Sequence, residues 1–174
     1  MRTRRRVELV EGVESSLVLV RPLAEKKGLR IRVESPAAPV EMSTDPQKLR
    51  PILINLLANA VKFSDSGDIV LILRIEGQDQ GVRVVFEVTD AGRGMSSEVQ
   101  AHIFDPFWQG ETGARKTSGS SGLGLSVARQ LARLLGGDVT VARSEPGQGS
   151  AVVLSSPTNY VTPAGPHPHT RSIL

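Results

Sequence analysis

The segment Asn55-Leu-Leu-Ala-Asn59-Ala-Val-Lys62-Phe63-Ser64 combines an apolar helical stripe with a polar one. Leucine, isoleucine and alanine recur at helical spacing through residues 49–60, which predicts a helix with one face in the core. At ~100° per residue, Asn55, Asn59 and Lys62 fall within a sector of roughly 60°. Two amide oxygens and one ammonium group therefore share one face. Taken alone, an ordinary polar helix face explains the segment about as well as a ligand-binding face does.

The polar face has the chemistry of a magnesium and phosphate site. Mg²⁺ is a hard cation that accepts amide oxygens and keeps water and phosphate oxygens as its other ligands. The ammonium of Lys62 can neutralise a phosphate. Asp45-Pro46 provides a capping carboxylate and a proline at the first helical position. A proline inside a helix costs on the order of 3 kcal/mol, so we expect a kink at Pro51 or a regular helix that starts at about this residue.

A second polar segment, Thr89-Asp90-Ala-Gly92-Arg-Gly94-Met95, follows the apolar run 84–88. A strand that ends in aspartate and glycine is commonly no more than a turn. The alternative is adenine selection, because a carboxylate accepts a hydrogen bond from the exocyclic amine of adenine. Gly92 and Gly94 would let the backbone come close to the base and adopt positive φ.

Two further segments follow: Phe104-Asp-Pro-Phe107 and Gly119-Ser-Ser-Gly122-Leu-Gly124-Leu125. Residues 109–121 are polar and glycine-rich, which predicts a mobile loop that can close over an anion. Backbone N–H groups at the start of the next helix suit phosphate oxygens. We hypothesise that Arg115 or Lys116 contacts the γ-phosphate. The glycines match neither a P-loop nor a dinucleotide fingerprint.

The order and spacing of the four segments resemble the ATP-binding catalytic domain of sensor histidine kinases, over roughly residues 8–155. That domain belongs to a wider group with gyrase, the mismatch-repair ATPases and the heat-shock chaperones. The resemblance implies a two-layer α/β sandwich of the Bergerat type, with a mixed sheet covered on one face by helices, and ATP and Mg²⁺ as cofactors. The expected ATP contacts are Asn55, Asn59, Lys62, Phe63, Asp90, Gly92, Gly94, Met95, Phe104, Phe107, Arg115, Lys116, Ser121, Gly122, Leu123, Gly124 and Leu125.

The resemblance also implies individual roles. Asn59 would bind the metal, Lys62 would meet phosphate, and Phe63 would lie near the adenine that Asp90 anchors. Asn55 and Lys62 would be catalytic, with Asn55 positioning or polarising the attacking group. Related ATPases such as gyrase carry a glutamate at the position of Asn55, and an amide cannot act as a carboxylate base. This difference favours phosphotransfer to a protein acceptor over rapid hydrolysis.

Two other features of the resemblance concern the lid and the acceptor. Phe104 and Phe107 would pack the base of the lid, and Ser120 stands where many members have glycine, so the lid hinge is expected to differ. The histidines of the chain are His102, His167 and His169. None has the sequence context of a phosphoacceptor. The expected partners are therefore an acceptor histidine hairpin outside this chain and a response regulator downstream.

Helices that alternate with hairpins favour a sandwich over a doubly wound sheet. We expect a helix at 8–27 with its last turn disturbed by Pro22, a strand at 29–33 with a short partner at 40–42, a helix from 46, a hairpin of 69–75 and 82–88, a helix at 123–135, and a hairpin of 139–141 and 151–154. Residues 1–7 would be a basic linker remnant, 8–155 the catalytic domain, and 156–174 a disordered tail.

Composition excludes several classes of function. The 174 residues fit one domain, carry a net charge of +3, and include no cysteine, so thiolate chemistry is excluded. No apolar run approaches the ~20 residues that span a bilayer. The arginines at positions 2 and 4–6 lack interleaved aromatic residues, which argues against nucleic-acid binding. We expect a cytoplasmic, monomeric fragment, which is compatible with a full protein that is anchored in a membrane.

Two alternatives remain open on the same fold. One is a serine kinase of the anti-sigma-factor type, whose phosphorylated product would be stable in acid. The other is a non-catalytic nucleotide-binding module that regulates a partner; Asn59, Lys62 and Asp90 argue against it, whereas Ser120 is compatible with it. A gyrase-like or chaperone ATPase is disfavoured by Asn55.

Overall fold

The computed structural model describes residues 4–77, 81–108, 122–158 and 171–173, the last segment by its backbone. Its elements are, in chain order, β1 (Arg5–Glu8), α1 (Leu9–Lys26), β2 (Arg30–Ser35), β3 (Glu41–Thr44), α2 (Pro46–Phe63), β4 (Asp68–Glu76), β5 (Arg83–Asp90), α3 (Ser97–His102), α4 (Gly124–Leu134), β6 (Asp138–Ser144), β7 (Ser150–Pro157) and β8 (Arg171–Ile173).

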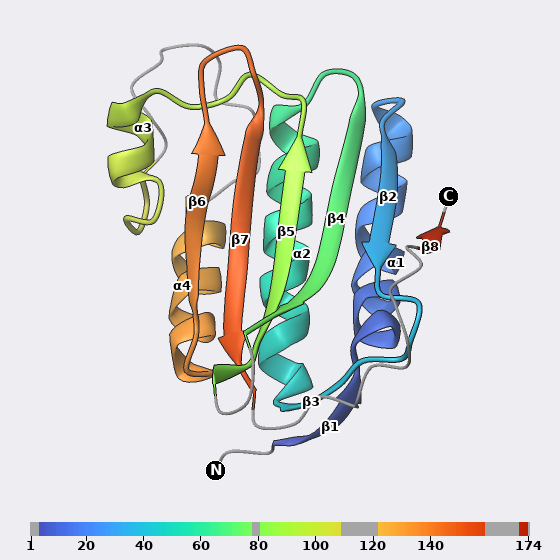
Figure 1. The fold of residues 1–174 in the computed structure, drawn as a ribbon. Helices are drawn as coiled ribbons and strands as arrows, with labels where there is room; N and C mark the ends of the chain where they lie inside the picture. Colours follow the sequence, from blue (N-terminus) through green and yellow to red (C-terminus); the bar gives the residue numbers. More distant parts are fainter. Residues whose placement is uncertain (1–3, 78–80, 109–121, 159–170, 174) are drawn as a thin grey trace.

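A mixed sheet forms one layer of the molecule, in the strand order β6-β7-β5-β4-β2-β8 (Figure 1). Strands β2 and β4 pair in parallel, and the other neighbours pair antiparallel. Helices α1, α2 and α4 lie together on one face of this sheet (Figure 1). The predicted two-layer α/β sandwich is confirmed, and so are the two predicted hairpins.

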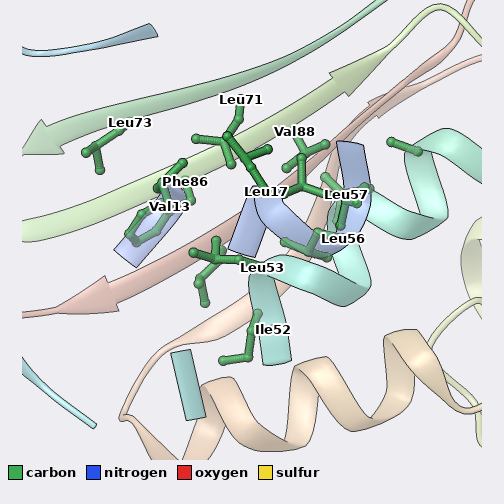
Figure 2. Packing of buried hydrophobic residues seen from close by; sticks show 14 of the residues in the cluster. Val13, Leu17, Ile52, Leu53, Leu56, Leu57, Leu71, Leu73, Phe86 and Val88 are labelled. Atoms are coloured by element: carbon green, nitrogen blue, oxygen red, sulfur yellow. The ribbon is translucent and has the colours of Figure 1, made fainter. Parts of the chain in front are cut away.

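The core lies between the helices and the sheet. Figure 2 shows Leu17 of α1 and Leu53 and Leu57 of α2 close to Leu71 of β4 and Phe86 of β5. These five side chains are almost completely buried. Packing of this amphipathic face supplies most of the stability of such helices, and it holds α2 firmly against the sheet.

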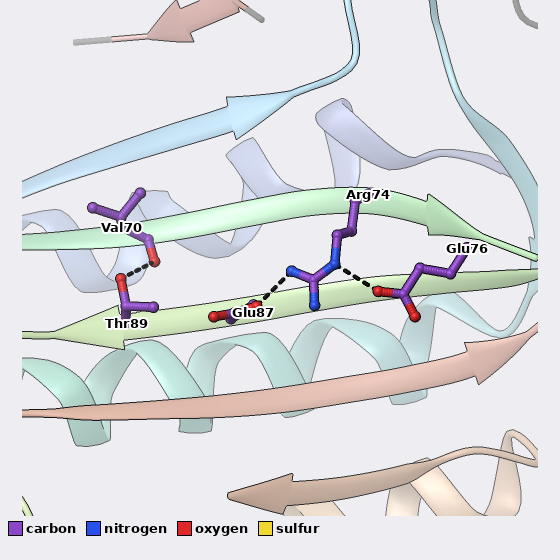
Figure 3. Close-up of polar contacts among 5 residues, drawn as sticks. All are labelled: Val70, Arg74, Glu76, Glu87 and Thr89. Atoms are coloured by element: carbon purple, nitrogen blue, oxygen red, sulfur yellow. Dashed lines mark hydrogen bonds and ion pairs between the residues drawn. The ribbon is translucent and has the colours of Figure 1, made fainter. Parts of the chain in front are cut away.

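The opposite face of the sheet carries charged side chains. Arg74 projects from β4 and donates to Glu76 at 2.7 Å and to Glu87 of β5 at 2.5 Å (Figure 3). Alternate residues of β4, such as Leu71 and Leu73, point to the helices and are buried. The sheet therefore buries one face, as the period of two predicts.

Helix α2 begins where its cap predicts. The Asp45 carboxylate accepts a hydrogen bond from the Gln47 N–H at 3.0 Å, and Pro46 is the first helical residue. Pro51 lies inside the helix, so the expectation that the regular part starts at about Pro51 is wrong. Burial of Leu49 and the residues one turn later offsets the missing backbone donor.

The N-terminal strand pairing differs from the prediction. β3 does not pair with β2 but with β1, in antiparallel register from Arg5↔Thr44 to Glu8↔Glu41. Residues 5–7, expected as linker, thus belong to a strand, and Glu8 caps α1 by accepting from the N–H groups of Val10 and Glu11. At the other end, β7 extends to Pro157, and β8 pairs with β2 inside the segment expected as a tail.

Candidate functional site

The polar face of α2 ends beside the loop that follows β5. Asn55 and Asn59 are half-buried on α2, and Lys62 is exposed in its last turn. The Phe63 carbonyl accepts a hydrogen bond from the Arg93 N–H at 3.3 Å. The structure therefore brings together two segments that lie thirty residues apart in the sequence.

Gly92 allows this close approach. A Cβ atom at position 92 would lie 2.3 Å from the Phe63 carbonyl oxygen and 2.8 Å from Oδ1 of Asp90. Any side chain at this position would push the loop away from α2. The φ angle of Gly92 is not positive. Glycine is therefore required here by the lack of space for a side chain and not by the backbone conformation.

Asp90, at the end of β5, is a half-buried carboxylate. Burial raises its pKa above the usual aspartate value, and this effect is opposed by backbone N–H groups of Gly92 and Ser150 and by the charge of Arg143. Oδ1 accepts from the Gly92 N–H at 2.8 Å. A carboxylate that is desolvated and fixed in this way is a typical feature of a ligand site.

The neighbouring hairpin β6–β7 holds Asp90 in place. Asp90 pairs in register with Ser150 of β7, and Gly149 has φ +74, with its would-be Cβ only 2.0 Å from the Asp90 carbonyl oxygen. Gly149 lies in the turn between the two strands of the hairpin predicted at 139–141 and 151–154. Its positive φ and its contact with Asp90 follow from the pairing of β5 with β7. The residues near position 149 alone do not predict that pairing.

The same hairpin fixes the second half of the glycine segment. Gly94 has φ +65 and lies against the Glu145 carbonyl, where a Cβ would come within 1.8 Å. The Met95 N–H donates to the Ser144 hydroxyl at 2.8 Å. Gln100 of α3 donates to the carbonyls of both Met95 and Ser144 at 3.0 Å. The backbone around Gly94 is thus held by the β6–β7 hairpin and by α3.

Two cations flank the Phe63 ring. The Lys62 ammonium lies 4.9 Å and the Arg93 guanidinium 4.4 Å from its centroid. Partial desolvation lowers the pKa of Lys62, although its side chain is exposed, and the positive charge of Arg93 lowers it further. An anion placed here would relieve that repulsion. Arg93 was not predicted, because an arginine between two glycines carries no motif of its own.

The start of α4 lies beside Asn55. A Cβ atom on Gly124 would lie 3.1 Å from Oδ1 of Asn55, and Gly122 has φ +70. Leu123, the N-cap residue, makes no side-chain capping hydrogen bond, while Leu125 is buried in the core. An uncapped helix start offers backbone N–H groups and a positive dipole end to an anion.

The aromatic box lies next to this glycine segment. The Phe107 N–H donates to the Gly122 carbonyl at 3.2 Å, but the Phe107 side chain is 71% exposed and its φ is +64. Phe104 packs against the core, and the Arg129 guanidinium lies 4.6 Å from its ring centroid. His102 bonds to Asp105 at 2.8 Å.

Three of the predicted ATP contacts, Arg115, Lys116 and Ser121, lie outside the described residues, as does Ser120. Within the described residues, no group of three or more His, Cys, Asp or Glu could hold a metal ion. The candidate metal ligands on the α2 face are the amide oxygens of Asn55 and Asn59, a donor type that suits Mg²⁺ when phosphate and water supply its other ligands. Asn59, one turn before Lys62, fits that description.

A profile of the family described as histidine kinase-, DNA gyrase B-, and HSP90-like ATPase matches residues 44–159, more than half of the chain. The chain belongs to this family. It is the ATP-binding catalytic domain of the sensor histidine kinase type, and the matched range includes α2, the Asp90 segment and the start of α4.

Curated relatives support this placement. The autoinducer 2 sensor kinase/phosphatase LuxQ of Vibrio parahaemolyticus is 41% identical over 80% of this chain, and the sensor histidine kinase RcsC of Salmonella typhimurium is 39% identical over 78%. These matches cover 16% and 14% of the relatives. The chain thus spans a small part of the proteins that it matches.

Solved structures of histidine kinases share the fold. Full-length ShkA in complex with AMPPNP is similar with a TM-score of 0.74 and 31% identity, over 91% of this chain and 32% of that one. The nucleotide-free catalytic domain of ThkA has a TM-score of 0.71 and 25% identity, over 89% and 95% of the two chains. In the part of this chain that the structure describes, no helix combines the length and apolarity that crossing a bilayer requires.

Proposed function

We propose that this domain, with Mg²⁺, transfers the γ-phosphoryl group of ATP to a histidine on a dimerisation and phosphoacceptor hairpin. The observation that carries the proposal is the desolvated Asp90 carboxylate beside the last turn of α2. Adenine offers an amine to a carboxylate, and its phosphates suit Lys62 and the uncapped start of α4. The sensor kinases among the relatives support the choice of a histidine acceptor.

Each group has one task in this proposal. Asp90 accepts the hydrogen bond from the adenine amine, and Phe63 lies along the base. Lys62 and the N-terminal amides of α4 hold the phosphates, while Asn59 supplies an amide oxygen to the metal. The cation spreads the charge that develops on the phosphoryl oxygens.

The transfer itself needs positioning more than covalent chemistry. A neutral imidazole nitrogen of the acceptor forms a bond to the γ-phosphorus while the bond from phosphorus to the β–γ bridging oxygen breaks, and ADP leaves with the electron pair. Asn55 lies at the junction of α2 and α4 and would orient the reacting groups. Because its amide cannot remove a proton from water, hydrolysis of ATP should be slow.

The partners of the reaction are part of the proposal. The acceptor hairpin lies elsewhere in the full-length protein or on another chain, and a response-regulator aspartate receives the phosphoryl group next. We place the reaction in the cytoplasm, where ATP is available, and the isolated domain is a monomer. Arg115 or Lys116 would contact the γ-phosphate, and alanine at both should lower the transfer rate.

Binding of an ATP analogue tests the first half of the proposal. Titration calorimetry should show binding that depends on magnesium in the unaltered chain. Absence of binding with and without magnesium would refute the proposed function. A non-catalytic module would bind ATP without transferring phosphate.

Phosphotransfer tests the second half. The chain is mixed with a separately purified acceptor hairpin of a sensor kinase, γ-labelled ATP and Mg²⁺. Label on the hairpin should be lost in acid and kept in base, as expected of phosphohistidine, and an acceptor His→Ala hairpin serves as the control. Acid-stable label would instead indicate a serine kinase.

A further inference from the structure

We propose that Lys27 is a positioning residue for the nucleotide site, an inference that rests on the proposed function. Its ammonium group donates to the carbonyls of Val61 at 2.8 Å, Lys62 at 3.1 Å and Ser64 at 2.6 Å. An ammonium has three N–H donors, and here all three are used on one turn of backbone. That turn carries the phosphate-binding and adenine-facing side chains of α2.

The end of α2 depends on partners from outside the helix. The last four carbonyls of an α-helix have no N–H partner within the helix itself. The Ala60 carbonyl accepts from the Ser64 N–H at 3.1 Å, and the Phe63 carbonyl accepts from the Arg93 N–H at 3.3 Å. Lys27 bonds the carbonyls of Val61 and Lys62 between them and places a positive charge at the negative end of the helix dipole.

The backbone that presents Lys27 is itself fixed. Lys27 is the C-cap of α1, and its N–H donates to the Ala24 carbonyl at 3.0 Å. Gly28 has φ +67, and the Leu29 N–H donates back to Ala24 at 3.0 Å. The ammonium is therefore a bridge between two ordered helix ends. It lies more than thirty residues in sequence from the groups that it positions.

Without this bridge, water would replace the ammonium at the carbonyls and the last turn of α2 would fray. The side chains of Lys62 and Phe63 would then sample several orientations, and nucleotide binding would have to order them again. Asp90 would be unaffected, because its position depends on the β6–β7 hairpin. The loss should therefore be larger for nucleotide phosphates than for adenosine.

The test compares Lys27→Met with Lys26→Met, which removes the same charge from the adjacent residue; both lysines are exposed. We expect Lys27→Met to weaken binding of the ATP analogue about tenfold, in line with loss of charged hydrogen bonds, and Lys26→Met to change it less than twofold. Lys27→Arg should restore part of the affinity, because a planar guanidinium cannot reproduce three converging bonds. Thermal unfolding confirms that each variant is folded.

A double-mutant cycle separates positioning from general stability. In a Lys62→Met background, Lys27→Met should cost less than it does in the unaltered chain, because part of what Lys27 positions is already gone. Hydrogen exchange of the amides of residues 62–64 should accelerate in Lys27→Met and not in Lys26→Met.

Two results would overturn the inference. One is an unaltered affinity for the ATP analogue in a folded Lys27→Met protein. If Lys27→Met does not fold, the same result in a folded Lys27→Gln protein overturns the inference. The other is an equal cost of Lys27→Met in both backgrounds. If the unaltered chain itself does not bind the analogue, the proposed function fails first, and that result is distinct from either of these.

Discussion

Replacing Asp90 by Asn should separate nucleotide binding from fold stability. The amide keeps an oxygen that can accept the Gly92 N–H bond seen at 2.8 Å, which preserves this connection to the loop. It removes the charge that would accept the adenine amine. A charged hydrogen bond contributes ~1.5–3 kcal/mol, which corresponds to about 10- to 150-fold in affinity for ATP.

Stability should change in the opposite direction. Burial raises the pKa of Asp90 in the folded state, so the native protein binds more protons than the unfolded chain between the two pKa values. The free energy of unfolding then falls as pH rises through this window, which starts near the ordinary aspartate pKa of 3.8, and the cost is fully present above the folded pKa. At neutral pH, Asp90→Asn should therefore unfold at the same temperature as the unaltered chain or higher.

The assay is calorimetric titration with an ATP analogue, combined with thermal unfolding of the same samples at pH 4 and pH 7. The reasoning is refuted if Asp90→Asn binds the analogue as tightly as the unaltered chain. It is also refuted if the variant unfolds at a markedly lower temperature at pH 7, because Asp90 would then be a stabilising residue and not a strained ligand-binding one.

Gly92→Ala should lower the unfolding temperature and nucleotide affinity, because its Cβ would lie 2.3 Å from the Phe63 carbonyl; thermal unfolding against Gly81→Ala, where a Cβ meets nothing within 4 Å, checks this. Lys62→Met should weaken ATP binding more than adenosine binding, and equal losses by calorimetry would argue against a phosphate contact. Arg93→Met should raise the pKa of Lys62 toward its usual value, as followed by NMR titration of the Lys62 side chain; an unchanged pKa would mean that burial alone sets it.

The parts of the site that could be predicted from sequence are those that depend on local spacing. A helix stripe places Asn55, Asn59 and Lys62 on one face, and a strand that ends in Asp90 and glycines marks a turn. The parts that could not be predicted depend on contacts between distant segments. Arg93 reaches the Phe63 ring only because Gly92 lets the loop touch α2.

The same distinction explains the fold. Alternating strands and amphipathic helices predicted the sandwich, because each pattern is read within ten or twenty residues. The partner of β3 was predicted wrongly because Arg5–Glu8 pairs with a strand more than thirty residues away. Pro51 shows that helix propensity alone does not decide where a helix begins. The cap at Asp45 and the burial of Leu49 stabilise α2 enough to offset the cost of an interior proline.

The surroundings of Asp90 and Lys62 in the fold disfavour the charged form of each side chain. Burial raises the pKa of Asp90 and lowers the pKa of Lys62, so both shifts move toward the neutral form. A hydrogen-bond donor at the first and a phosphate placed against the second would each favour the charged form. One ligand must supply a hydrogen-bond donor at one end and negative charge at the other. An adenine nucleotide meets both conditions.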